Sequence, residues 1–251
     1  MALILKENDW AQEAIVSRSL GNKPTETLTL IARHYLESGY KKSNVRNMLD
    51  TFLLQCDPDA SLPGWSKALD RVVIQASKRG SLNIDSIDIT RGELGIIDSM
   101  KGVQVRRLAF TLLCLAKYRA AVNPLSNGWV RDEGNEIMST ANINTSIRRQ
   151  SAMYKHLGDI GFIQFARAVD NTSVRVLIAE DGPVVMRITD MRNLGYQYLK
   201  HHGGDFFDCT NCGITAKIDE PGRGARQKYC RSCAIEVATQ QRVNSVMRRK
   251  L

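Results

Sequence analysis

The sequence has few aromatic residues, few histidines and no long apolar run. Phe, Trp and Tyr make up 6% of the 251 residues, and only four residues are His. So few aromatics offer no visible platform on which unpaired bases could stack, which disfavours RNA binding. No stretch approaches the roughly 18 consecutive apolar residues that span a bilayer, so we expect no membrane-spanning helix.

The first ten residues, MALILKENDW, lack the features of a secretion signal. They contain no basic segment, no long apolar core and no small-residue cleavage site. We therefore expect a soluble, cytoplasmic protein that does not bind membranes.

The common catalytic motifs are also absent. The sequence has no Walker loop, no G-x-S-x-G and no dinucleotide fingerprint. A nuclease of the HNH type needs a histidine beside its zinc module, but none of the histidines follows Cys209: they are His34, His156, His201 and His202. We therefore expect a protein that is not an enzyme.

Lys and Arg outnumber Asp and Glu only after the first hundred residues. Residues 1–100 carry 12 Lys and Arg against 13 Asp and Glu, whereas residues 101–251 carry 23 against 13. A positive field of this kind attracts polyanions such as nucleic acids. The neutral first hundred residues are better suited to meeting another protein.

Four of the six cysteines have the spacing C-x₂-C-x₁₇-C-x₂-C; they are Cys209, Cys212, Cys230 and Cys233. This spacing is typical of a structural Zn²⁺ site in which four thiolates fill all positions. Two disulfides or two redox-active dithiols would use the same residues. The lack of a secretion signal disfavours the former, and the lack of a βαβ context disfavours the latter.

We expect residues 204–251 to form a treble-clef zinc finger. In this interpretation ITAKI (214–218) and RQKY (226–229) pair as a hairpin, and the second cysteine pair begins a helix. From Pro221 onward the finger has eight Lys or Arg and one acid, so it is either a phosphate-binding arm or a solvated tail. The candidate DNA contacts that we take from it are Arg226, Lys228, Arg231, Arg242, Arg248 and Arg249.

The hydrophobic pattern before the finger divides into three parts. Residues 1–80 show helical periodicity in four short segments and predict a helical bundle domain. Residues 81–100 change to an alternating pattern, that of a short strand or an irregular connector, and we assign them as a linker. Residues 101–203 have the order helix, short helix, tight turn, helix and hairpin, which predicts a winged helix-turn-helix domain.

The third helix of this domain, residues 146–160, would read the major groove. On a helical wheel Ile147, Met153, Tyr154, Leu157 and Ile160 share one face, and the opposite face carries Arg148, Ser151, Ala152, Lys155 and Asp159. The candidate DNA contacts from the domain are Asn144, Thr145, Arg148, Arg149, Lys155, Arg167 and Arg175. Charged surface helices are common, and winged helices also bind proteins.

The segments RRLAFTLLCLAKYRAAVNP, VDNTSVRVL and ITDMRNLGYQYLK, followed by a cysteine finger, resemble uncharacterised proteins of bacterial phages and prophages. This resemblance covers most of the chain and implies a bacterial host cell, but no activity. The segment TLTLIARHYLESGYKKSNVRNMLDTFLLQCDP is similar to the helical domains that follow the catalytic core in phage and plasmid primases. The primase carboxylate motif is absent, so this similarity implies only the role of a replication partner.

Together these features predict a mainly α protein with small β elements that binds double-stranded DNA and regulates transcription or replication. The alternative is an adaptor that binds a polymerase or another replisome protein through its neutral helical domain. A homodimer is compatible with either function.

Overall fold

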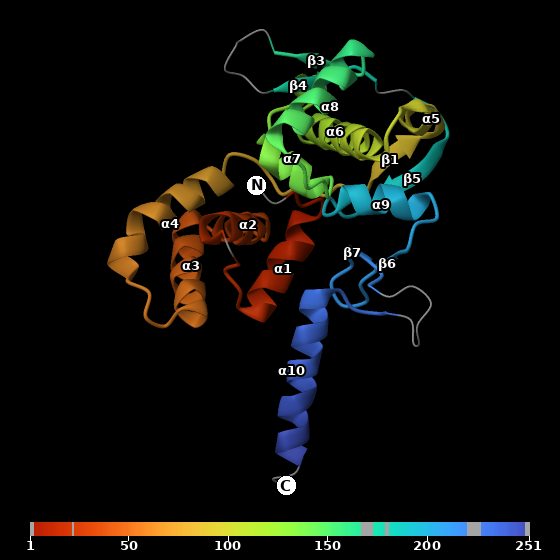
Figure 1. Cartoon of the computed structure of the whole chain (residues 1–251). Helices are drawn as coiled ribbons and strands as arrows, with labels where there is room; N and C mark the ends of the chain where they lie inside the picture. Colours follow the sequence, from red (N-terminus) through yellow and green to blue (C-terminus); the bar gives the residue numbers. More distant parts are fainter. Residues whose placement is uncertain (1–2, 22, 167–172, 179–180, 220–226, 249–251) are drawn as a thin grey trace. The chain divides into compact units, whose positions relative to one another are not determined.

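The computed structural model describes residues 3–21, 23–166, 173–178, 181–219 and 227–248, with only the backbone at 243–244 and 246–248. The chain divides into two compact units, Met1–Asp85 and Ser86–Leu251. Helices dominate both, and small antiparallel sheets lie in the second unit (Figure 1). The expected mainly α fold with small β elements is therefore confirmed.

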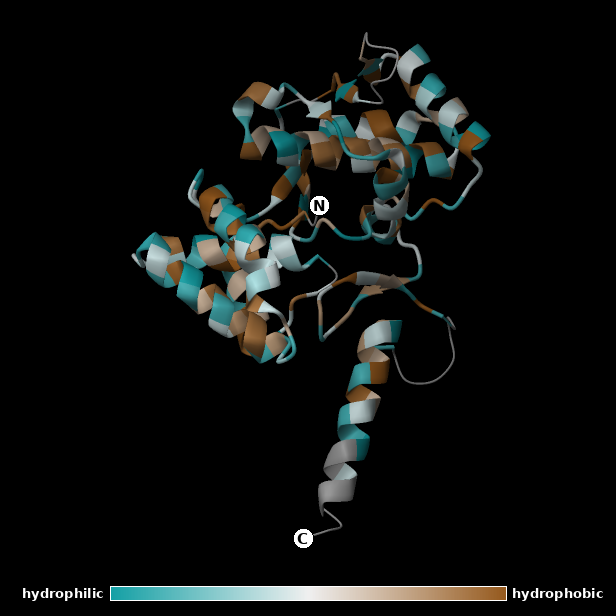
Figure 2. Ribbon diagram, turned by 90° about the vertical axis from the view of Figure 1, so that its left-hand side faces the viewer, coloured by the Kyte–Doolittle hydropathy of each residue, from teal (hydrophilic) through white to brown (hydrophobic). Residues whose placement is uncertain are grey.

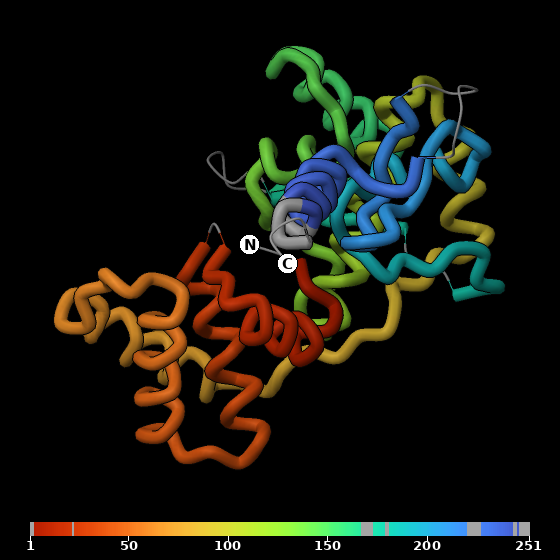
Figure 3. The backbone as a smooth tube through the Cα atoms, turned by 90° about the horizontal axis from the view of Figure 1, so that it is seen from below, coloured from red at the N-terminus to blue at the C-terminus, as the bar shows by residue number. Residues whose placement is uncertain are grey.

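Unit 1 is a bundle of helices, coloured red to orange in Figure 3: α1 (Glu7–Ser17), α2 (Pro24–Glu37), α3 (Lys42–Cys56) and α4 (Leu62–Ala76). Pro24 opens α2, where its missing N–H is not needed. The Ser61 hydroxyl caps α4 by accepting from the Gly64 N–H at 3.3 Å. The helices bury a common core that includes Leu28, Ile31, Leu49, Leu53 and Leu69.

A buried carboxylate fastens the end of unit 1 to its first helix. Glu7 is 3% exposed. Its carboxylate accepts hydrogen bonds from Arg33 Nη1 at 3.1 Å, from Arg79 Nη2 at 2.7 Å and from the Leu82 N–H at 2.9 Å. The Glu7 N–H donates in turn to the Leu82 carbonyl at 3.0 Å. The buried carboxylate of Glu7 thus holds residues 79–82 against α1.

Residues 81–100, expected to be a linker, contain regular structure. Strand β1 (Ile87–Thr90) pairs antiparallel with β5 (Val184–Ile188), and a capping box opens helix α5 (Arg91–Ser99). Glu93 of this box is fully buried, and its carboxylate lies 2.6 Å from the Lys117 ammonium. Because the partner strand lies far along the chain, the local pattern carried no sign of this pairing.

Helix α6 (Val103–Val122) forms the centre of unit 2, and every residue from Leu108 to Ala116 is buried. Hydrophobic and hydrophilic residues alternate along the helices in Figure 2. Around α6 lie a short strand, two further helices and a hairpin (Figure 1). These elements are α6 (Val103–Val122), the 3₁₀ turn η1 (Pro124–Ser126), β2 (Trp129–Val130), α7 (Gly134–Thr140), α8 (Ile147–Asp159), β3 (Ile163–Phe165) and β4 (Val174–Val176). The strands form one sheet in the order β2-β4-β3. Strand β2 lies between the first two helices of this domain, where the expected order of elements contained no strand.

The rest of unit 2 comprises α9 (Leu194–His201), β6 (Phe206–Asp208), β7 (Thr215–Lys217) and α10 (Arg231–Arg248). Strands β6 and β7 pair antiparallel, with Phe207 opposite Ala216. The expected pairing of ITAKI with RQKY is not found among the described residues, where ITAKI pairs with a strand that precedes Cys209; Arg226 lies outside them. None of the described helices is both long enough and apolar enough to cross a membrane.

Candidate functional site

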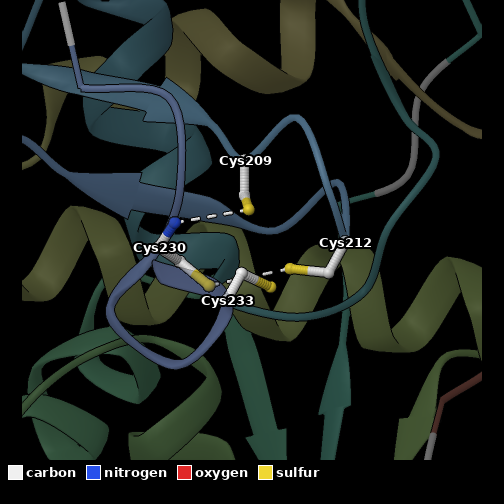
Figure 4. Close-up of side chains that lie close together, drawn as sticks. All are labelled: Cys209, Cys212, Cys230 and Cys233. Carbon is white, nitrogen blue, oxygen red and sulfur yellow. Dashed lines mark hydrogen bonds between the residues drawn. The ribbon is translucent and has the colours of Figure 1, made fainter. Parts of the chain in front are cut away.

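The four C-terminal cysteines form one cluster, as their spacing predicts. Cys209 and Cys212 lie in the turn between β6 and β7, while Cys230 and Cys233 lie at the start of α10. Their sulfur atoms lie within 4.8 Å of one another, and the side chains converge on one point (Figure 4). Cys212 Sγ and Cys230 Sγ are 3.7 Å apart. Among the described residues this is a group that could hold a metal ion.

These distances fit a tetrahedral thiolate site. A metal bound at about 2.3 Å from each sulfur separates neighbouring sulfurs by about 3.8 Å. The observed separation of 3.7 Å between Cys212 Sγ and Cys230 Sγ agrees with that value. Four sulfur ligands are compatible with zinc and would leave no position for a reactive water. Held there, a metal would fix the hairpin to α10.

Backbone N–H groups stabilise the thiolate form of Cys209. Burial opposes ionisation of the Cys209 thiol, but N–H groups of Cys230, Cys212 and Asn211 outweigh it and lower the pKa to about 6. The Cys230 N–H lies 3.3 Å from Cys209 Sγ. Burial and the neighbouring thiols raise the pKa of Cys212 to about 12. A cation that binds here therefore displaces the remaining protons, so acid should weaken its binding.

The turn that presents Cys209 and Cys212 is fixed by the backbone. Gly213 has a positive φ of 73°, which glycine adopts without strain. The Cys209 N–H donates to the Ile214 carbonyl, and the Gly213 N–H donates to the Cys209 carbonyl, both at 2.9 Å. Arg192 Nη2 donates to the Cys212 carbonyl at 2.6 Å. The hairpin therefore holds its thiols near a single centre.

The second candidate site is the outer face of α8. Met153 and Leu157 are buried, whereas the side chains that we expected to point outward are exposed, namely Arg148, Ser151, Ala152, Lys155 and Asp159. Arg149, beside them, is also exposed. Within the described part of the chain none of the three cations forms an ion pair. Residues 137–158 contain no Asp or Glu. The face is therefore basic over most of its length, and the exposed Asp159 lies at its C-terminal end.

Two predictions about this helix need correction. Ile147 is 79% exposed and Ile160 is 48% exposed, although the wheel placed both on the inner face. They lie at the two ends of the helix, where no further turn covers them. Tyr154 behaves as expected: it is half-buried, and burial raises its pKa to about 12.

The other candidate DNA contacts are dispersed. Asn144 is exposed and Thr145 half-buried in the turn before α8, while Arg175 donates from Nε to the Asn127 carbonyl at 2.9 Å. Exposed positions in the finger are Lys228, Arg231 and Arg242. Outside the described residues or side chains lie Arg167, Arg226, Arg248 and Arg249. The structure thus brings together the basic residues of α8, whereas in the finger it describes the side chains of only Lys228, Arg231 and Arg242 among the candidates.

Three further polar residues surround the turn between α7 and α8, and sequence reasoning did not single them out. They are Arg107, Asn142 and Asn193, whose hydrogen bonds join α6, the turn and α9. The sequence offered only the hint that two of them are asparagine, a residue that adopts the positive φ seen at both positions readily.

Comparison with known proteins found no matching family model, no significantly similar curated protein and no significantly similar solved structure.

Proposed function

We propose that this protein binds double-stranded DNA through a winged helix-turn-helix domain in which α8 enters the major groove. The observation that carries the proposal is the exposed basic face of α8, with Arg148, Arg149 and Lys155. Arginine is the most common reader of guanine in the major groove. A small residue such as Ala152 would let the helix approach the base edges.

The order of elements around α8 supports this interpretation. A helix, a short strand, two helices and a two-stranded hairpin follow one another from α6 to β4. The sheet order β2-β4-β3 places the strand before α7 against the hairpin. In a winged helix this sheet flanks the reading helix, and the first helix of the turn braces it. The sheet would then lie beside the DNA backbone, with Arg175 at its centre.

The cysteine cluster would act as a structural zinc site of the treble-clef type. In support, its first pair lies in a turn and its second pair opens a helix. The basic residues of the finger would add contacts to phosphates. A regulatory role in transcription or replication within a bacterial cell is part of the proposal, as is the lack of an enzymatic activity.

Replacing both Arg148 and Lys155 by alanine should weaken binding to a duplex about 100-fold, because each cation would lose contacts to bases or phosphates. Fluorescence anisotropy on a duplex selected from a random pool measures the change. Both side chains are exposed, so the circular dichroism and the unfolding transition of the variant should match those of the parent.

A matched control replaces Lys41 and Lys42, two exposed lysines at the start of α3, by alanine. This variant loses the same charge and should bind the duplex within about threefold of the parent, since residues 1–100 are neutral overall. An equal loss in both double variants would point to charge alone and would contradict the assignment of α8 to the groove.

A further inference from the structure

Two asparagines with left-handed backbone meet beside the turn that leads into α8. Asn142 follows the last residues of α7 and has φ 55°, and Asn193 caps the start of α9 with φ 51°. Asparagine is one of the few residues other than glycine that adopts this conformation readily. Both side chains are half-buried and hydrogen-bonded.

Their side-chain amides form a continuous hydrogen-bonded relay. The Tyr196 N–H donates to Asn142 Oδ1 at 3.1 Å, and Asn142 Nδ2 donates to Asn193 Oδ1 at 2.9 Å. Asn193 Nδ2 then donates to the Thr215 carbonyl at 2.9 Å. The relay therefore joins α9 and the α7–α8 turn to β7, the strand that follows Cys212.

The turn is packed tightly against α9 and α6. A Cβ added to Gly195 would lie 1.9 Å from the Ala141 carbonyl oxygen, so the two backbones are in direct contact. Arg107 donates from Nε to the same carbonyl at 3.0 Å and from Nη2 to the Asn142 carbonyl. With so little free space, a movement of α9 must be transmitted to the turn.

On the other side α9 and the segment before it are fastened to the cysteine hairpin. Arg192 bridges the Asp190 carboxylate and the Cys212 carbonyl, with donor distances of 2.6 Å to each. Lys200 pairs with Asp208, whose other carboxylate oxygen accepts from Thr215 Oγ1 at 2.8 Å. The backbone that carries two of the thiols is therefore joined to both ends of α9.

We propose that the cysteine hairpin positions the entry to α8 through α9, with Asn193 as the positioning residue. The effect on DNA binding rests on the proposed function of α8. The structural link between the cysteine hairpin and the α7–α8 turn does not. When the cysteines hold a metal, the hairpin is ordered and the Thr215 carbonyl stays in place for Asn193. Loss of the metal releases this acceptor, and the α7–α8 turn then loosens. Metal binding thereby controls how firmly the α7–α8 turn holds the start of α8 in place.

Hydrogen exchange on the full chain, followed by mass spectrometry, tests the link without DNA. The reporters are the amides of Asn142 and Ile143, which donate to Ser139 and Met138 at 2.9 Å. With one equivalent of Zn²⁺ these amides should exchange slowly, and chelation should speed their exchange about tenfold or more. Peptides from the middle of α6 should not change.

The substitution Asn193→Asp tests the hydrogen bond to Thr215 without disrupting the rest of the fold. Aspartate tolerates left-handed backbone and keeps the acceptor for Asn142, but it cannot donate to the Thr215 carbonyl. Asn193→Asp loaded with Zn²⁺ should therefore exchange in the turn as fast as the chelated parent, while still binding one zinc per chain. The control Asn135→Ala, at an exposed position of α7, should behave like the parent.

Two results would overturn the proposal: turn amides in the parent that are indifferent to chelation, or Asn193→Asp with the same slow exchange as the parent. If only the proposed function were wrong, the turn amides would still respond to chelation and to Asn193→Asp, but the parent would not bind a duplex. If both proposals are right, Asn193→Asp should bind the selected duplex about tenfold more weakly than Asn135→Ala.

Discussion

Replacing Cys230 by serine is expected to abolish stoichiometric zinc binding and to unfold the region from Phe206 to the start of α10. Cys230 is 7% exposed, and its sulfur lies 3.7 Å from Cys212 Sγ, so the substitution removes one of the four converging thiols. A structural zinc site contributes about 10–16 kcal/mol to the folding of the residues it joins. The small hairpin β6–β7 has little other core, because the buried residues of its cluster are the cysteines themselves.

The measurement is zinc per chain after dialysis against a weak chelator, by elemental analysis. The parent should keep one equivalent, and Cys230→Ser should bind at least about 100-fold more weakly. Cys56→Ser is the matched control, because Cys56 lies in α3 of unit 1, far along the chain from the cluster. If Cys230→Ser kept its zinc, the assignment of the ligands would be wrong.

Replacing Glu7 by alanine should be the most damaging change in unit 1. It leaves the buried Arg33 guanidinium and the Arg79 guanidinium without their carboxylate, and the Leu82 N–H without its side-chain acceptor. Removing one partner of a buried ion pair costs about 3–5 kcal/mol. Small domains have about 5–15 kcal/mol of stability in total, so unit 1 would be close to unfolding.

Urea unfolding of the full chain measures this effect. In a Trp129→Phe background the remaining tryptophans are Trp10 and Trp65, so fluorescence reports on unit 1 alone. Glu13→Ala on the same helix is the control; Glu13 is exposed and should change the free energy of unfolding by less than about 0.5 kcal/mol. A loss of less than about 1 kcal/mol in Glu7→Ala would mean that the network contributes little.

The sequence predicted best those features that depend on local spacing. The cysteine cluster followed from two C-x-x-C pairs, since four thiols at such spacing have few other uses. The outward side chains of α8, such as Arg148 and Lys155, followed from a rotation of 100° per residue. The same rule failed at Ile147, because it does not include the end of the helix.

Features that depend on distant partners were missed. Residues 87–90 pair with a strand that lies about a hundred residues later, with Ile87 opposite Ile188, so their pattern suggested a linker. The contact between Glu7 and Leu82 and that between Asn142 and Asn193 are of the same kind. In each, a polar residue that looks ordinary in the sequence becomes important once folding brings it to a distant partner.

The most direct test of DNA binding is the salt dependence of the affinity of the parent protein for a duplex. If α8 and the finger neutralise about five phosphates, the plot of log K against log salt should have a slope of about −4 or steeper. An adaptor that meets only proteins would have no measurable affinity at low salt. A steep slope with tight binding is the predicted result, and the absence of binding at about 50 mM salt would contradict it.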